Sequence, residues 1–117
     1  MEERATYKED MTWATKRLYI DVLVERKELE KALQVSREHS QTMKRKVGFG
    51  SSFTFAAIER YLEVLEKTGR KEERIKEMGK YLEILERELM EGDAKVREVE
   101  ERYHELVGEQ QKPAVLG

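Results

Sequence analysis

The chain has 117 residues, enough for one domain, and its 23 basic and 25 acidic side chains leave a net charge of −2. With 38% apolar and 41% charged residues, the composition is too polar for a thick globule and is typical of long helices with solvated outer faces. The mixed charge and the periodic apolar residues argue against a disordered chain. Cysteine is absent, which excludes disulfides and thiolate metal sites.

The sequence predicts a cytoplasmic protein that does not bind membranes. The first residues, Met1–Arg4, lack the apolar run of a signal peptide. The longest apolar-rich run, Leu18–Val24, is far shorter than the roughly 20 residues that span a bilayer. Asparagine is also absent while Glu, Lys and Arg are abundant, a composition typical of thermophilic proteins. A thermophilic source is therefore an expectation.

The first predicted element is one long helix over about residues 3–47, because this segment contains neither glycine nor proline. Acidic residues gather at its start and basic residues at its end, which complements the helix dipole. Apolar residues recur at helical spacing; they include Met11, Ala14, Leu18, Val22, Leu29, Ala32, Leu33 and Met43.

A Gly/Phe/Ser elbow at residues 48–53 ends that helix, because its two glycines permit a turn with positive φ. A serine of the elbow or Thr54 caps the short helix predicted over 54–67. Gly69 is then expected at the C′ position of this helix. The alternative is a continuous helix that tolerates Gly69 at a cost of about 1 kcal/mol.

The third predicted element is a long coiled-coil-like helix over 70–107, followed by a flexible tail at 109–117, so that residues 1–108 form a single domain. Its apolar residues follow the 3-4 spacing of a coiled-coil seam over more than four heptads, and Gly92 occupies one seam position. The seam residues are Ile75, Met78, Leu82, Leu85, Leu89, Val96, Val99, Tyr103 and Leu106.

These elements predict an all-α, elongated antiparallel hairpin that dimerises into a bundle of four or more helices. Two long helices alone make a thin layer, and a second copy buries both apolar seams. The run Leu18–Val24 is apolar on nearly every helical face except at Asp21, which favours burial on several sides. The expected oligomerisation residues are those of the third-helix seam together with Trp13, Leu18 and Val22.

All three phenylalanines of the chain, Phe49, Phe53 and Phe55, lie at the elbow. They have two interpretations: they close the end of the bundle, or they form an aromatic tip that binds a partner, since aromatic residues dominate interface energetics. Phe55 fits the apolar stripe of the following helix. Phe49 lies between two glycines and has the least obvious role in a core. The sequence therefore favours a partner contact for Phe49 and closure of the bundle end for Phe53 and Phe55.

The neighbourhood of the elbow is basic, which gives an alternative function. Arg37, Lys44, Arg45 and Lys46 beside aromatic rings could contact the phosphates and bases of a nucleic acid. Cations at a helix C-terminus are, however, also explained by the helix dipole, and the sequence pI is about 5.8.

Neither histidine, His39 nor His104, has the companions that a metal site needs, and both are expected on the solvated helix surface. Acid–base catalysis by two carboxylates needs surroundings that separate their pKa values, and the sequence indicates no such pair. No motif indicates a cofactor or a small-molecule substrate. We therefore expect no enzyme activity. The predicted function is a non-catalytic, oligomeric helical interaction module that scaffolds or regulates a partner protein, with nucleic-acid binding through the elbow as the alternative.

Overall fold

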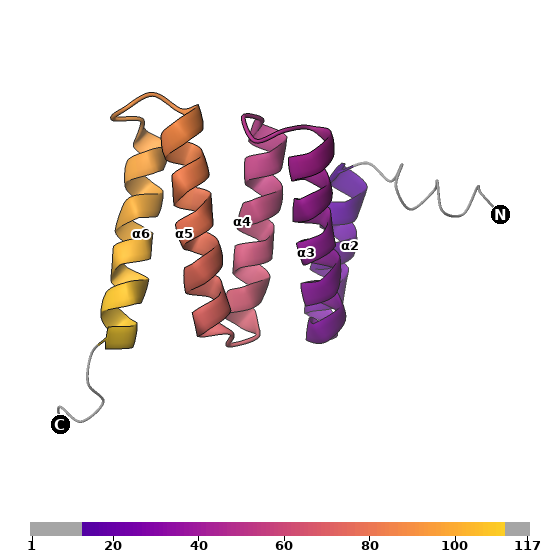
Figure 1. Ribbon diagram of the computed structural model, residues 1–117. Coiled ribbons are helices and arrows are strands. Elements are labelled where there is room, and N and C mark those ends of the chain that lie inside the picture. Colours follow the sequence, from indigo (N-terminus) through magenta and orange to yellow (C-terminus); the bar gives the residue numbers. More distant parts are fainter. Residues whose placement is uncertain (1–12, 112–117) are drawn as a thin grey trace, which may run out of the picture.

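The computed structural model describes residues 13–111, and side chains from Thr15 to Glu109. Within that range the chain forms five helices: α2 (Trp13–Glu25), α3 (Leu29–Lys46), α4 (Ser52–Lys67), α5 (Lys71–Glu88) and α6 (Ala94–Gln111). The prediction of an all-α bundle is confirmed at this level. Helices α3 to α6 run alternately up and down side by side, and α2 packs behind them against α3 and α4 (Figure 1).

The long helix predicted over 3–47 is wrong within the described residues, because the chain turns at Lys27. Lys27 has a φ of 60°, the left-handed conformation usual at a C′ position. Its N–H donates to the Val24 carbonyl at 3.0 Å, and the N–H of Glu28 donates to the Leu23 carbonyl at 2.8 Å. These are the two bonds of a Schellman motif. The left-handed lysine costs about 1–2 kcal/mol, which burial of Ile20 and Leu23 in the core offsets.

The end of the short helix at Gly69 is confirmed. Gly69 has a φ of 72° and closes the same motif, with the N–H of Arg70 donating to the Leu65 carbonyl at 3.1 Å. The elbow follows expectation too: the hydroxyl of Ser51 accepts from the N–H of Phe53 at 3.1 Å, so Ser51 caps α4, which begins two residues earlier than predicted.

The continuous helix predicted over 70–107 is also wrong. Helix α5 ends at Glu88, and Gly92, with a φ of 85°, reverses the chain. The carboxylate of Asp93 then caps α6 by accepting from the N–H of Lys95 at 2.8 Å. Since α6 folds back beside α5, the two halves of the predicted seam face each other within one chain.

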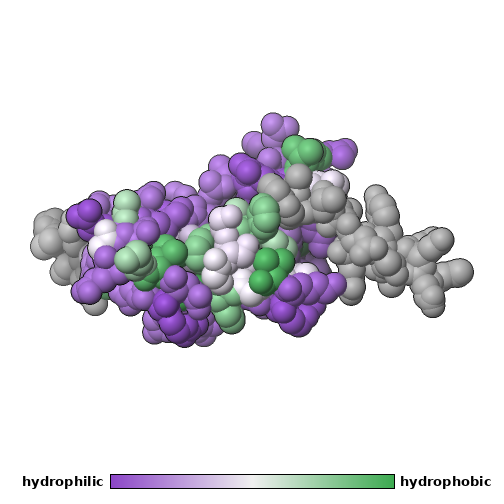
Figure 2. Space-filling model, turned by 90° about the horizontal axis from the view of Figure 1, so that it is seen from above, coloured by the Kyte–Doolittle hydropathy of each residue, from purple (hydrophilic) through white to green (hydrophobic). Residues whose placement is uncertain are grey.

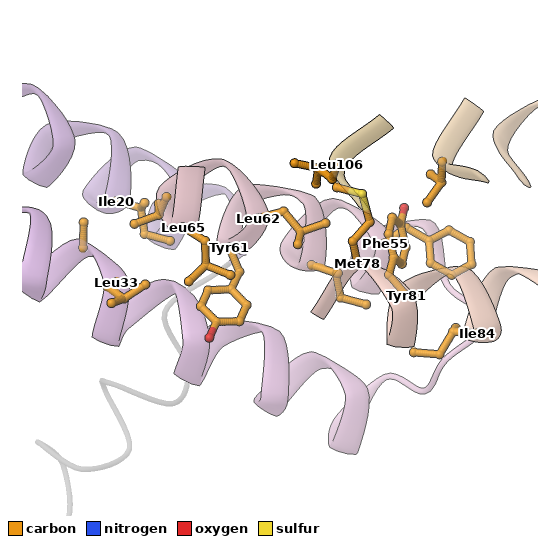
Figure 3. Close-up of a cluster of buried hydrophobic side chains, with 14 of the residues drawn as sticks. Ile20, Leu33, Phe55, Tyr61, Leu62, Leu65, Met78, Tyr81, Ile84 and Leu106 are labelled. Carbon is orange, nitrogen blue, oxygen red and sulfur yellow. The ribbon is translucent and has the colours of Figure 1, made fainter. Parts of the chain in front are cut away.

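One apolar core connects all five helices (Figure 3). Ile20 of α2 and Leu33 of α3 lie at one end of it, and Phe55, Met78 and Tyr81 lie toward the other. Further buried members are Leu62 and Leu65 of α4 and Val99 and Leu106 of α6. Residues of all five helices of one chain therefore contribute to this core.

Two buried tyrosines tie neighbouring helices together through carboxylates. The Tyr81 hydroxyl donates to Glu59 at 2.7 Å, and Lys95 donates to the same carboxylate at 2.9 Å, which joins α4, α5 and α6. Burial alone raises the pKa of Glu59, but these hydrogen bonds outweigh it and hold the pKa below its ordinary value. The Tyr61 hydroxyl donates to Glu73 at 2.9 Å, which joins α4 and α5. These hydrogen bonds connect α4 to α5 and α6.

Candidate partner-binding surface

Thr54 connects the elbow to the end of the bundle through a hydrogen bond. This side chain is fully buried, and its hydroxyl donates to the carbonyl of Gly48 at 2.6 Å. The φ of Gly48, 103°, is accessible mainly to glycine. The turn therefore presents Val47 and Phe49 outward from a fixed position after α3, which ends at Lys46.

The structure separates the three predicted site phenylalanines. Phe55 is buried, at 8% exposed, and its ring centroid lies 6.1 Å from that of Tyr81. Phe49 and Phe53 remain 40% and 45% exposed. Only Phe49 and Phe53 therefore belong to a surface, and Phe55 belongs to the core.

Sequence reasoning missed the contribution of the connection between α5 and α6, which lies at the same end of the molecule as the elbow (Figure 1). Met90 in this connection is 81% exposed, and the guanidinium of Arg87 lies 5.9 Å from the centroid of the Phe49 ring. Seen from this end, apolar and weakly polar residues run along the middle of the molecule between polar flanks (Figure 2). We call Val47, Phe49, Phe53 and Met90 the loop-end surface.

Two of the four basic residues on which the nucleic-acid alternative depends are paired with carboxylates of α5. Arg37 pairs with Glu73 at 2.9 Å and also donates to the Tyr61 hydroxyl at 3.0 Å, and the hydrogen bond to Tyr61 is the main reason that its pKa is raised. Lys44 pairs with Glu77 at 3.4 Å. Arg45 and Lys46 are exposed. Carboxylates of α5 therefore pair with two of the four basic residues, Arg37 and Lys44.

The predicted oligomerisation residues divide into two groups. Those of the third-helix seam pack within the chain: Met78, Leu85, Val99 and Leu106 are buried, and Ile75, Leu82, Leu89, Val96 and Tyr103 pack against the same core. Leu18 and Val22 of α2, by contrast, are 64% and 47% exposed, and Tyr19 beside them is 37% exposed. The side chain of Trp13 lies outside the described residues. We call Leu18, Tyr19 and Val22 the α2 stripe.

His39 is buried, which corrects its predicted place on the solvated surface, whereas His104 is exposed. Burial, followed by the charge of Lys16, lowers the pKa of His39 from its ordinary value of 6.5 to about 4. Its imidazole is therefore neutral near pH 7. Its Nδ1 atom has no hydrogen-bond partner in the described part of the chain.

No helix within residues 13–111 combines the length and the apolar character needed to cross a membrane. Comparison of the chain with protein-family models, with curated proteins and with solved structures finds no match in any of the three.

Proposed function

We propose that the chain is a non-catalytic helical interaction module that binds a partner protein through the loop-end surface. The observation that carries this proposal is the exposure of Phe49, Phe53 and Met90 beside a core that is complete without them. All three lie in or next to the α3–α4 and α5–α6 connections, and exposed apolar patches mark interaction sites more often than single scattered residues do. Aromatic residues at such sites contribute most of the binding free energy.

The rigidity of the elbow supports the same proposal. Ser51 and Thr54 fix the turn through hydrogen bonds, so a partner does not have to order the loop on binding. A surface that is already ordered avoids part of the entropic cost of association. The cation–π contact between Arg87 and Phe49 also holds the ring in place while leaving 40% of the residue exposed.

The test is capture of proteins from extracts of the native source by the immobilised full chain. The Phe49→Ala, Phe53→Ala double variant should recover at least about tenfold less of any specifically captured protein, because each anchor contributes on the order of 2 kcal/mol. The matched control is His104→Ala, which removes an exposed ring from α6, outside both proposed surfaces, and should leave recovery unchanged. Equal recovery by the double variant and the wild type would refute the proposal.

We also propose that the module self-associates through the α2 stripe. Leu18 and Val22 lie four residues apart on one helical face, and both are exposed although α2 already packs against α3 and α4. The stripe replaces the third-helix seam as the expected dimer contact, because that seam is occupied within the chain.

We expect light scattering to report a dimer for the wild type at tens of micromolar, a concentration typical of such measurements. Leu18→Lys, Val22→Lys should give a folded monomer, since two charges at the contact disfavour its desolvation. Met90→Lys serves as control, because it places a charge at an exposed apolar position elsewhere. A wild-type chain that is monomeric would show that the stripe does not mediate self-association.

A further inference from the structure

Helix α2 is joined to α3 by a turn in an unfavourable conformation. Lys27 in this turn has a φ of 60° and is the one residue other than glycine with a positive φ in the described part of the chain. A side chain makes this left-handed conformation unfavourable. Residues 3–47 contain neither glycine nor proline, so the sequence also permits a helix that runs straight through the turn. The contacts of α2, and not its turn, therefore hold α2 against the bundle.

Helix α2 contacts two of the described helices, α3 and α4 (Figure 1). Ile20 and Leu23 are buried there, and Asp21 pairs with Arg60 of α4 at 3.0 Å. The packing is incomplete, because a pocket of about 150 Å³ remains between the three helices. His39 lines this pocket and is buried, and its Nδ1 has no hydrogen-bond partner in the described residues. Gaps forfeit dispersion contacts and unpaired buried polar atoms are unfavourable, so α2 is packed less favourably than a close-packed helix.

Helix α2 also carries apolar residues on a second face, which points away from the bundle. Leu18 and Val22 on this face are 64% and 47% exposed. At about 3.6 residues per turn, a helix that continued from α2 into α3 would place them about five turns before Ser36 and Ser40, on the same face. Ser36 and Ser40 are buried in α3, so this face continues the buried face of α3. The pattern is therefore compatible with α2 folded back and with α2 as a direct continuation of α3.

We propose that two copies of the chain exchange α2. In each copy the turn at residues 26–28 straightens, and the face of Ile20 and Leu23 enters the groove between α3 and α4 of the other copy. The second copy fits this groove because the contacts are those that α2 makes within one chain, while Lys27 leaves its unfavourable conformation in both copies. Exchange of an identical element is a low-cost route to a dimer, and short strained hinges favour it.

This exchange goes beyond the proposed function, since it involves neither the loop-end surface nor contact through the α2 stripe. It requires α2 to leave its groove, so we expect it when chains fold together at high concentration.

The ion pair between Asp21 and Arg60 provides the test. Asp21→Arg and Arg60→Asp each place like charges at this contact, both in a folded-back chain and in a homodimer. When the two variants are refolded together, opposite charges meet at both contacts only in a mixed dimer with exchanged α2. At about 1 mM, which saturates any association with a micromolar Kd, mixed dimers should exceed each homodimer at least about tenfold. Native mass spectrometry after dilution measures this ratio, because exchanged helices return only by leaving their grooves.

Lys27→Gly tests the turn in the otherwise unchanged chain, and does so even if the charge variants fail to fold. Glycine removes the unfavourable conformation from the folded-back chain and weakens a helix through this position. The wild type refolded at about 1 mM should retain a dimer after dilution, and Lys27→Gly should lower the ratio of dimer to monomer at least about tenfold. Lys31→Gly is the matched control. Lys31 is an exposed residue of α3 that is helical in both forms, so its replacement should leave the ratio unchanged.

Random mixing of the two charge variants would overturn the exchange, as would a refolded wild type without a persistent dimer or a dimer that Lys27→Gly leaves unchanged. Chains that associate only through the α2 stripe mix at random, because their α2 helices stay in their own grooves. Such a result would leave the stripe contact standing. Partner capture through the loop-end surface is likewise unaffected by any of these outcomes.

Discussion

Replacing Phe55 by alanine is expected to lower the free energy of unfolding by about 3–5 kcal/mol, as for other buried aromatic residues. Phe55 is 8% exposed and packs its ring 6.1 Å from that of Tyr81. Met78 and Ile84 lie in the same part of the core (Figure 3). Removal of the ring leaves a cavity beneath the elbow, which the surrounding helices close only in part.

Phe49→Ala is the matched control, because it removes the same ring from a position six residues earlier in the chain. Phe49 is 40% exposed, so we expect its replacement to change the free energy of unfolding by less than about 1 kcal/mol. Urea unfolding of the two variants measures both effects. A large destabilisation by Phe49→Ala would identify Phe49 as a structural residue that closes the end of the bundle.

The second large effect is a loss of stability on acidification that arises at His39. Burial and the charge of Lys16 lower the pKa of His39 from 6.5 to about 4. The unfolded chain therefore binds a proton at this residue between those values while the folded chain does not. Stability must then fall as the pH falls below 6.5, by about 2 kcal/mol between pH 7 and pH 5.

The comparison of two leucine variants isolates this effect. His39→Leu should flatten the dependence of the unfolding free energy on pH between 7 and 5, whereas His104→Leu, at an exposed histidine, should leave it as in the wild type. The carboxylate of Glu59 has a pKa below its ordinary value, so its contribution to stability is lost only at lower pH. A wild-type profile that is flat over this range would contradict the burial of His39.

The apolar periodicity of the sequence predicted which residues face inward better than it predicted where the helices end. Met78, Leu85, Val99 and Leu106 were expected in one seam and lie in one core. The spacing of apolar residues shows which face of a helix is buried. This spacing stays the same when a turn divides the helix into two antiparallel helices. Gly92 followed by Asp93 indicates the turn between α5 and α6, because glycine permits the turn and aspartate caps the next helix.

The turn at Lys27 could not be predicted in this way. The same Schellman motif ends α2 and α4, but only the second has glycine at the left-handed position. Lysine gives no local sign of that conformation. The motif forms at Lys27 because packing of α2 against α3 and α4 outweighs its cost, and this is a property of the tertiary structure.

The candidate site was predicted in part. The elbow and the exposure of Phe49 follow from the sequence, because a glycine-flanked phenylalanine has no helical face to join. Phe53 was expected to close the end of the bundle, but it is 45% exposed. Met90 was missed because the sequence predicted a continuous helix over residues 70–107. The pocket beside His39 was missed because its lining residues come from three helices, α2, α3 and α4. Contacts of this kind depend on how helices are placed and leave no local pattern.

The most direct test of the central claim is photo-crosslinking in native cells with a benzophenone-bearing phenylalanine analogue at position 49. The matched control carries the same analogue at Glu101, an exposed position on α6. Because Phe49 lies in the loop-end surface, position 49 should give a discrete adduct with a second protein species that position 101 does not give. Identical adduct patterns at the two positions, or an adduct at position 49 with another copy of the chain alone, would contradict partner binding through this surface.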